Sequence, residues 1–193
     1  MIHKRTLVKI ASTNHYIMGN LIERHPVKTI IAVLTSEPSL LSTVYQHLSD
    51  ELGDIDYTSE LIPFSNTKYY EAEMGEGIQR QFISFEKLMD AGALADRKLF
   101  TNSVEQMFIG EKTHKRRVNL DIGYICQAKL VLASTKDHAH RIYLRDGIFA
   151  EMTLRYYQKT FQAWEWTYPD YRSETYIGIF NHIRKLYRKQ LDF

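Results

Sequence analysis

The sequence has few of the residues that mark secreted, disulfide-stabilised or membrane-spanning proteins. A single cysteine, Cys126, stands among 193 residues. One chain can therefore form neither an internal disulfide nor a thiolate metal cluster, and this cysteine usage fits the reducing cytoplasm. No apolar run approaches the roughly 20 residues that a helix needs to cross a bilayer. These absences predict a cytoplasmic protein without a membrane segment.

The sequence also lacks a large excess of charge of one sign and the usual nucleotide-binding motifs. The 25 basic and 23 acidic residues leave a net charge of only +2, so a nucleic-acid-binding surface would have to come from a local patch. The string nearest to a P-loop, at residues 110 to 113, lacks the required glycine five residues earlier. No G-x-G-x-x-G or G-x-S-x-G string occurs. The sequence motifs therefore indicate neither a particular cofactor nor the chemistry of a serine hydrolase.

The composition is that of one folded domain. Hydrophobic residues make up 44% and aromatic residues 12% of the chain, which is enough to bury a core at this length. Residues 1 to 25 contain no continuous apolar segment, and we interpret them as a loosely packed N-terminal extension. Residues 26 to 193 are predicted to form a single domain, because no linker or repeat divides them.

The order of the expected strands and helices predicts an α+β fold. Apolar, β-branched runs alternate with helical stripes that follow a proline or end at a glycine. The expected strands are 29–35, 55–64, 79–88 and 116–122, and the expected helices are 38–52 and 91–109. This order predicts a mostly antiparallel sheet with a ferredoxin-like split β-α-β core. A C-terminal hairpin over residues 140–157 and a terminal helix that begins at Ser173 are expected to extend this core.

The hairpin has a register that its own sequence can decide. A two-residue loop of Asp146 and Gly147 would mix polar and apolar side chains on both faces. A three-residue loop that adds Arg145, with Gly147 in the left-handed conformation, separates them and places Arg141 opposite Glu151. The face that becomes apolar in this register is expected to pack on the core. It consists of Ile142, Leu144, Ile148, Ala150, Met152 and Leu154.

Charged residues recur between apolar ones from Lys112 to Arg172, as a binding site requires. We expect a pocket for a small anionic ligand, phosphorylated or a nucleotide, because arginine and lysine bind phosphate and carboxylate oxygens. The predicted ligand contacts are Arg141, Lys136, Arg155, Lys129 and Tyr143. The predicted catalytic residues are His140, which would donate or shuttle a proton, with Glu151 and Asp121 on the carboxylate side of the site. Whether the pocket only binds the ligand or also turns it over stays open at this point.

Three alternatives stand beside this hypothesis. Arg141 and Glu151 can form an ordinary cross-strand pair while the other basic side chains reach water. His138 and His140 stand two residues apart, but two histidines alone predict no metal site. The basic loop that ends at Arg117, together with the aromatic residues between Trp164 and Tyr171, instead suits an RNA-binding or accessory protein without catalytic activity.

Several strings, in this order, resemble one protein family. They are TKYYEAEMG, FISFEKLMDAGALADRKLFTN, RRVNLDIGY, KLVLASTKDHAHRIYL, FAEMTLRY and WTYPDYRS. Together they resemble the prokaryotic domain of unknown function number 4416 over about residues 26 to 190. Lys136, Asp137, His140 and Arg141 match the pattern of that family, whereas His138 stands at a free position. The resemblance implies no defined activity. Some members carry the label of a GTP-binding protein, which the missing P-loop does not support here.

Overall fold

The computed structural model describes residues 25–64, 70–110 and 115–191. This part of the chain contains nine strands, four α-helices and three short 3-10 helices. The strands are β1 (Val27–Thr35), β2 (Ile55–Thr58), β3 (Ile62–Pro63), β4 (Gln79–Met89), β5 (Val118–Ile125), β6 (Lys129–Ser134), β7 (Arg141–Arg145), β8 (Ile148–Tyr157) and β9 (Thr160–Ala163). The helices are α1 (Leu41–Leu52), α2 (Glu71–Met74), α3 (Leu94–Met107), α4 (Glu174–Gln190), η1 (Pro38–Leu40), η2 (Ala91–Ala93) and η3 (Asp170–Arg172).

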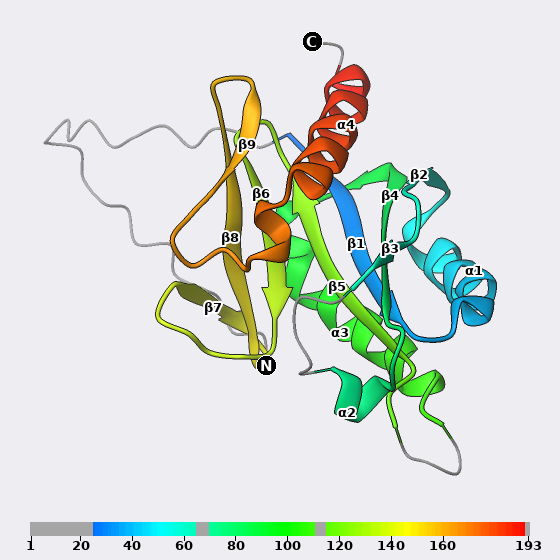
Figure 1. Cartoon of the computed structure of the whole chain (residues 1–193). Coiled ribbons are helices and arrows are strands. Elements are labelled where there is room, and N and C mark those ends of the chain that lie inside the picture. The colour runs from blue at the N-terminus through cyan, green and yellow to red at the C-terminus, as the bar shows by residue number, and fades with distance from the viewer. Residues whose placement is uncertain (1–24, 65–69, 111–114, 192–193) are drawn as a thin grey trace, which may run out of the picture.

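All nine strands form one sheet (Figure 1). Its order is β2-β4-β1-β5-β6-β8-β7, with β3 added to β4 and β9 added to β8, and every strand pair is antiparallel. In its first four places, β1 and β2, which are joined through α1, are separated by β4, and β4 and β5, which are joined through α3, are separated by β1. This is the arrangement of a ferredoxin-like unit. The predicted α+β class and antiparallel, ferredoxin-like core are therefore confirmed.

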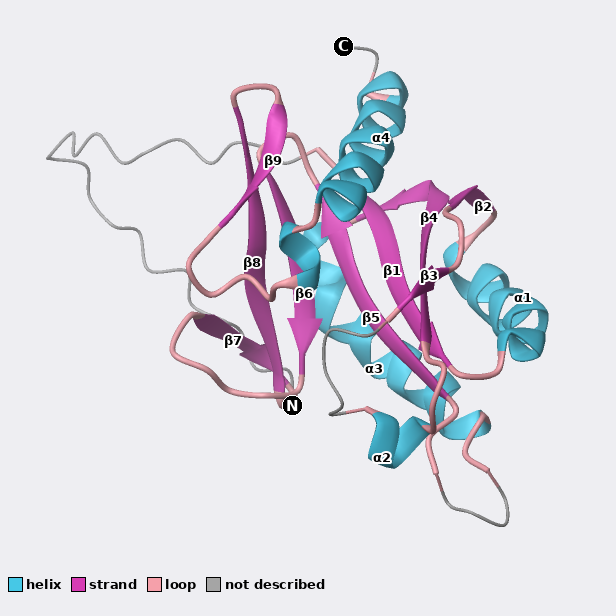
Figure 2. Ribbon diagram, in the orientation of Figure 1, coloured by secondary structure: helices cyan, strands magenta, loops and turns pink. Residues whose placement is uncertain are grey.

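The helices cover the two faces of the sheet unequally (Figure 2). Helices α1 and α3 pack on one face, which we call the α3 side, around buried residues such as Leu48, Leu94 and Phe85. Helix α4 packs on the other face, which we call the α4 side, where Phe82 and Phe180 meet edge to face with ring centroids 5.0 Å apart. In Figure 2, α4 lies at the end of the sheet opposite to α2 and β7.

Local signals explain where the helices begin and end. The Ser173 hydroxyl accepts a hydrogen bond from the Tyr176 N–H (3.3 Å), so α4 begins after its predicted N-cap. Gly53 ends α1 with a φ of +91°, a conformation that favours glycine. The single strand expected over residues 55–64 is instead two short strands, β2 and β3, which both pair with β4. The prediction also omits β6 and β9, and it ends β5 three residues early.

The β7–β8 hairpin has the predicted pairing but a different turn. Arg141 lies opposite Glu151, as predicted. Asp146 and Gly147 both have positive φ values, 52° and 74°, which are typical of a two-residue type I′ turn. A bulge between Tyr143 and Arg145 then restores the predicted register. The expected three-residue loop is therefore wrong, although Gly147 is left-handed.

The two faces of this hairpin are buried differently from the prediction. Ile148 packs in the core of the α3 side, but Ile142 is 71% exposed, and Leu144 and Met152 are exposed too. Glu151, on the face expected to be polar, is buried. The reason is position in the sheet: β7 is an edge strand, whereas Glu151 lies in the sheet interior between β6 and β7. Whether a side chain is buried depends on which strand or helix covers it. The alternation of polar and apolar residues along the hairpin does not determine this.

Strands β5 and β6 separate after a short contact. They pair only over residues 123–125. On the N-terminal side of this contact, where β5 has no β6 partner, side chains of α3 bind the backbone of Leu120. The Leu120 N–H donates to the Glu105 carboxylate (2.6 Å), and Lys98 Nζ donates to the Leu120 carbonyl (2.8 Å). Gly123 permits the close approach, because a Cβ there would lie 2.2 Å from a backbone oxygen of β6. The separation leaves Asp121 of β5 without a β6 partner in the sheet.

Candidate functional site

Two groups of charged side chains lie on the α4 side of the sheet. We call the first the His140 network; it consists of His140, Arg141, Glu151 and Trp166 with the groups that hold them. We call the second the Arg80 cluster; it consists of Arg80, Asp121, Asp170 and Tyr171.

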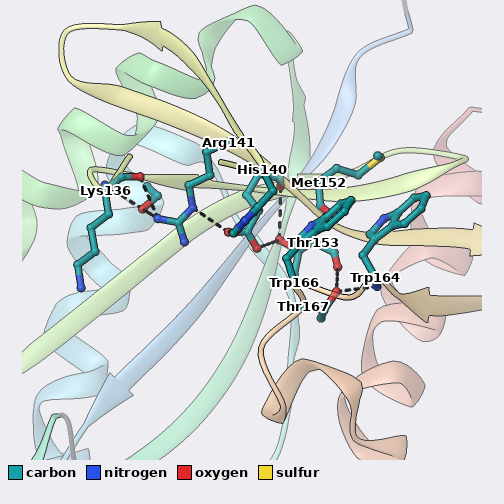
Figure 3. A network of polar contacts seen from close by, with 10 residues as sticks. Lys136, His140, Arg141, Met152, Thr153, Trp164, Trp166 and Thr167 are labelled. Carbon is teal, nitrogen blue, oxygen red and sulfur yellow. Dashed lines mark hydrogen bonds and ion pairs between the residues drawn. The ribbon is translucent and has the colours of Figure 1, made fainter. Parts of the chain in front are cut away.

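The His140 network, in which Figure 3 labels His140, Arg141 and Trp166, is centred on the carboxylate of Glu151. This residue is only 3% exposed, in the middle of β8. One carboxylate oxygen, Oε2, accepts a hydrogen bond from Arg141 Nε (2.8 Å) and lies 3.2 Å from His140 Nε2. A buried carboxylate needs such partners, because burying a charge without them is costly.

Arg141 fixes this carboxylate and the turn before β7. Its side chain is 4% exposed. Besides the contact to Glu151, Arg141 Nη1 donates to the Ser134 hydroxyl (2.7 Å) and to the Lys136 carbonyl (2.9 Å). Two of its nitrogens are thus committed within the protein. This geometry favours Arg141 as a positioning residue over its predicted role as a ligand contact.

The His140 ring lies close to two other aromatic side chains. It lies parallel to His138, with centroids 5.9 Å apart, and nearly parallel to Trp166, with centroids 5.6 Å apart. Trp166 is itself fixed by two contacts. Its Nε1 donates to the Met152 carbonyl (3.1 Å), and its ring stacks on that of Trp164, with centroids 5.2 Å apart. The His140 side chain remains 24% exposed. The ring is therefore oriented and still reaches solvent.

The Arg80 cluster holds a buried cation among aromatic rings. Arg80 is 3% exposed, and its guanidinium carbon lies 4.9 Å from the ring centre of Phe64. Arg80 Nη1 donates to the Tyr171 hydroxyl (3.2 Å), and Nη2 lies 3.4 Å from the Asp170 carboxylate. Burial lowers the pKa of Arg80, but the negative groups around it, Asp121 among them, outweigh this effect and raise that pKa overall. Arg80 therefore stays a cation.

Asp121 projects from β5 into this cluster. Its charge raises the pKa of Tyr171, which burial already holds well above the ordinary value. Burial also raises the pKa of Tyr70 to about 12, with a further contribution from Asp121. Within the described residues, the Asp121 carboxylate has no hydrogen bond or ion pair, although it is partly buried. It is thus a negative group that the fold does not neutralise directly.

The segment from Trp164 to Arg172 connects the two groups. Its Trp166 stacks on His140, and its Asp170 meets Arg80. The Thr167 hydroxyl ties the segment to β8 through the Thr153 carbonyl (2.6 Å). Arg80 and Asp170 are not among the site residues predicted from the sequence. Asp170 lies within the WTYPDYRS string, which was the available signal, whereas nothing marks Arg80 in the sequence.

The structure brings together only part of the predicted site. His140, Arg141 and Glu151 are in contact, while Asp121 belongs to the Arg80 cluster. Lys136 contributes its carbonyl to Arg141, and in Figure 3 its side chain extends away from His140.

The remaining predicted contacts lie elsewhere. Lys129 and Arg155 face each other across β6 and β8, four residues beyond Glu151 along β8. Arg155 lies over the Trp164 ring (4.8 Å). Tyr143 is exposed and contacts Phe149 edge to face. These three residues do not converge with the His140 network.

The basic loop considered for RNA binding is partly neutralised. Arg116 Nη2 donates to the Glu73 carboxylate (2.8 Å), and Arg117 Nε donates to Glu37 (2.7 Å). Residues 112 to 114 of this loop lie outside the described residues. The carboxylate partners reduce the local positive charge on which nonspecific binding of nucleic acid depends.

Comparison with known proteins identifies a family. The model of a domain of unknown function, DUF4416, matches residues 25–187. The chain belongs to this family. No curated protein and no solved structure matches it. Five of the strings that carry the resemblance each supply a residue of the α4 side described above, although they are far apart in the sequence: Tyr70, Asp121, His140, Glu151 and Asp170.

The described residues contain neither a cluster of metal ligands nor a helix of membrane-spanning character. Among the described residues, no group of three or more His, Cys, Asp or Glu side chains is placed to hold a metal ion. In the same part of the chain, no helix has the length and apolar character to cross a bilayer.

Proposed function

We propose that the α4 side of the sheet binds a small anionic ligand and that His140 transfers a proton to or from it. The observation that carries this proposal is the pairing of a partly exposed imidazole with a buried carboxylate. Oriented imidazole–carboxylate pairs are a common solution for general acid–base catalysis, because the imidazole changes its charge near neutral pH.

The contact to Glu151 defines how His140 would act. An ionised carboxylate only accepts hydrogen bonds, so the contact assigns the proton to His140 Nε2. Nδ1 is then the basic nitrogen of the neutral ring. When Nδ1 takes a proton, the negative charge of Glu151 stabilises the resulting imidazolium.

The remaining parts of the network act through His140 or Glu151. Arg141 keeps Glu151 in place, and Trp166 fixes the plane of the His140 ring. Both are positioning residues. They support the proposal because proton transfer requires a geometry that is fixed before the ligand arrives.

A pair of variants in one loop tests this role. A thermal-shift screen of phosphorylated metabolites identifies a ligand, and turnover of that ligand is then followed by NMR. His140→Gln should reduce turnover by about 100-fold or more, the usual contribution of a general acid–base group, with little loss of ligand affinity. His138→Gln removes the stacked neighbour, which has no carboxylate contact, and should leave turnover within about threefold of the wild type.

Equal rates for the two variants would contradict the role of His140. A ligand that binds but is not turned over by the wild-type protein would reduce the proposal to binding alone.

A further inference from the structure

Three nitrogen donors in or beside the Arg80 cluster lack acceptors. Arg80 Nε, Arg116 Nε and Asn119 Nδ2 are buried and have no hydrogen-bond partner within the described part of the chain. Arg80 and Asn119 as whole residues are 3% and 4% exposed. Such donors are rare in folded proteins, because each unsatisfied group costs about 1–3 kcal/mol. Their presence in or beside one cluster calls for a ligand with acceptor oxygens.

The sheet places two of these residues on either side of one residue of β1. Arg80 of β4 and Asn119 of β5 both pair with Leu34 of the intervening strand β1. Asn119 Oδ1 accepts a hydrogen bond from Arg116 Nη1 (2.8 Å), which leaves Nδ2 as the donor without a partner. The Arg116 guanidinium lies 5.9 Å from the ring centre of Tyr70, and the positive charges of Arg80 and Arg116 both lower the pKa of Tyr70 against the larger effect of burial.

The carboxylates near these arginines bind their terminal nitrogens. Asp170 is at Nη2 of Arg80, Glu73 is at Nη2 of Arg116 (2.8 Å), and Glu105 is at Nη1 of Arg116 (3.4 Å). The Nε donors are therefore left over after the ion pairs are formed. These three carboxylates outnumber the two guanidinium groups, so the cluster carries no excess of positive charge. A fully deprotonated anion would gain little there.

Asp121 adds the feature that selects the ligand. It stands two residues after Asn119 on the same strand, and therefore on the same face. Its carboxylate can only accept, so a ligand beside it must bring a donor of its own. Sulfate at neutral pH has no proton to offer. Orthophosphate keeps at least one P–OH group.

We propose that Arg80, Arg116, Asn119 and Asp121 form a subsite for a protonated oxyanion, either orthophosphate or a phosphate monoester that carries one proton. The three donors bind its oxygens, and Asp121 accepts its P–OH. This inference rests on the proposed function in one respect, because it names the anionic group of the ligand on which His140 acts.

The first experiment uses the wild-type protein. Orthophosphate should raise the melting temperature above that in NaCl of equal ionic strength, and sulfate should not. In ¹⁵N NMR spectra, orthophosphate should shift the Nε–H signals of Arg80 and Arg116. Arg97 is the internal control, because its Nε also lacks a partner but it pairs with Glu51 of α1, away from this face.

Two substitutions test the assigned contacts. Asn119→Asp retains the acceptor for Arg116 but removes the donor, and should weaken orthophosphate binding by about tenfold or more. Asn102→Asp on α3 adds the same charge elsewhere and should leave binding unchanged. Asp121→Asn should reduce the discrimination against sulfate, because an amide can donate to a fully deprotonated anion.

Methyl phosphate distinguishes the two sources of the anion. Its second pKa is about 6, so it carries the required proton at pH 5 and loses it by pH 8. Binding at pH 5 that weakens at pH 8 assigns the site to a phosphorylated ligand, whereas no binding at either pH assigns it to orthophosphate.

Clear outcomes would overturn the subsite. They are the absence of any effect of orthophosphate, equal binding of sulfate, or equal behaviour of the Asn119 and Asn102 variants. The NMR arm needs no variant, so misfolding of Asn119→Asp leaves the test intact. Failure of the subsite is also separable from failure of the proposed function, because His140→Gln should retain orthophosphate binding. If that variant binds orthophosphate but matches His138→Gln in turnover, only the proposed function fails.

Discussion

The two sides of β5 hold charged residues in opposite ways. On the α3 side, Lys98 and Glu105 of α3 are buried and bind the backbone of Leu120. On the α4 side, Asp121 has no hydrogen bond or ion pair among the described residues, and the neighbouring Asn119 retains a donor without a partner. The same separation of β5 from β6 produces both situations. Charged side chains between α3 and the sheet therefore stabilise the fold, whereas charged side chains beyond the helix remain available to a ligand.

The His140 network shares features of both sides. Its Glu151–Arg141 pair is as buried as the residues of the α3 side, yet the imidazole beside it reaches solvent. A fixed carboxylate below an accessible ring is the arrangement that a proton-transfer residue needs. Three substitutions test the difference between charged groups that stabilise the fold and charged groups that remain available to a ligand.

The largest effect is expected from Glu151→Ala. It leaves the Arg141 cation buried without its partner, which should lower the free energy of unfolding by about 3–5 kcal/mol in urea titrations. The double variant Arg141→Leu with Glu151→Leu removes both charges and should recover most of this loss. A loss below about 1 kcal/mol for Glu151→Ala would mean that the pair behaves as an exposed one and does not fix His140.

An intermediate effect is expected from Gly123→Ala at the crossing of β5 and β6. The new Cβ would meet a backbone oxygen, and the strands must shift, at a cost of about 1–3 kcal/mol by the same titration. Gly178→Ala in α4 is the matched control. Its Cβ would meet nothing within 4 Å, so we expect a gain of about 0.5–1 kcal/mol from helix propensity. Equal effects of the two changes would show that the crossing is not tightly packed.

The smallest effect is expected from Glu37→Gln. Hydrogen bonding to Arg117 lowers the pKa of Glu37, so the folded state favours the carboxylate. The stabilisation is present above the ordinary pKa of the group and disappears as the pH falls through the lowered value. Because the pair is largely exposed, we expect Glu37→Gln to cost only a few tenths of a kcal/mol at pH 7. Chemical denaturation at pH 7 and pH 3 should show the difference vanishing at the lower pH.

The fold could be predicted to a large extent from local patterns. The strand at residues 29–35, the helix before Gly53 and the helix after Ser173 each carry a signal within a few residues. The pairing of Arg141 with Glu151 followed from the polarity of the hairpin. The turn and the burial of its faces did not, because they depend on a bulge and on which neighbouring strand or helix covers each residue.

The candidate site could be predicted only in part, for a related reason. His140, Arg141 and Glu151 are within twelve residues of one another, so one hairpin register brings them together. Arg80 and Asp170 come from β4 and from the segment after β9, and no local pattern connects them. Lys129 and Arg155 share the composition of the site but lie at the other end of β8.

The sequence by itself determined the class of fold, the cross-strand partner of Arg141 and the family, because each depends on residue order over short distances. Only the tertiary structure decided which charges are structural and which are available. That distinction depends on where α3 and α4 end over the sheet and where β5 leaves β6. These are contacts between segments far apart in the chain, and periodicity carries no information about them.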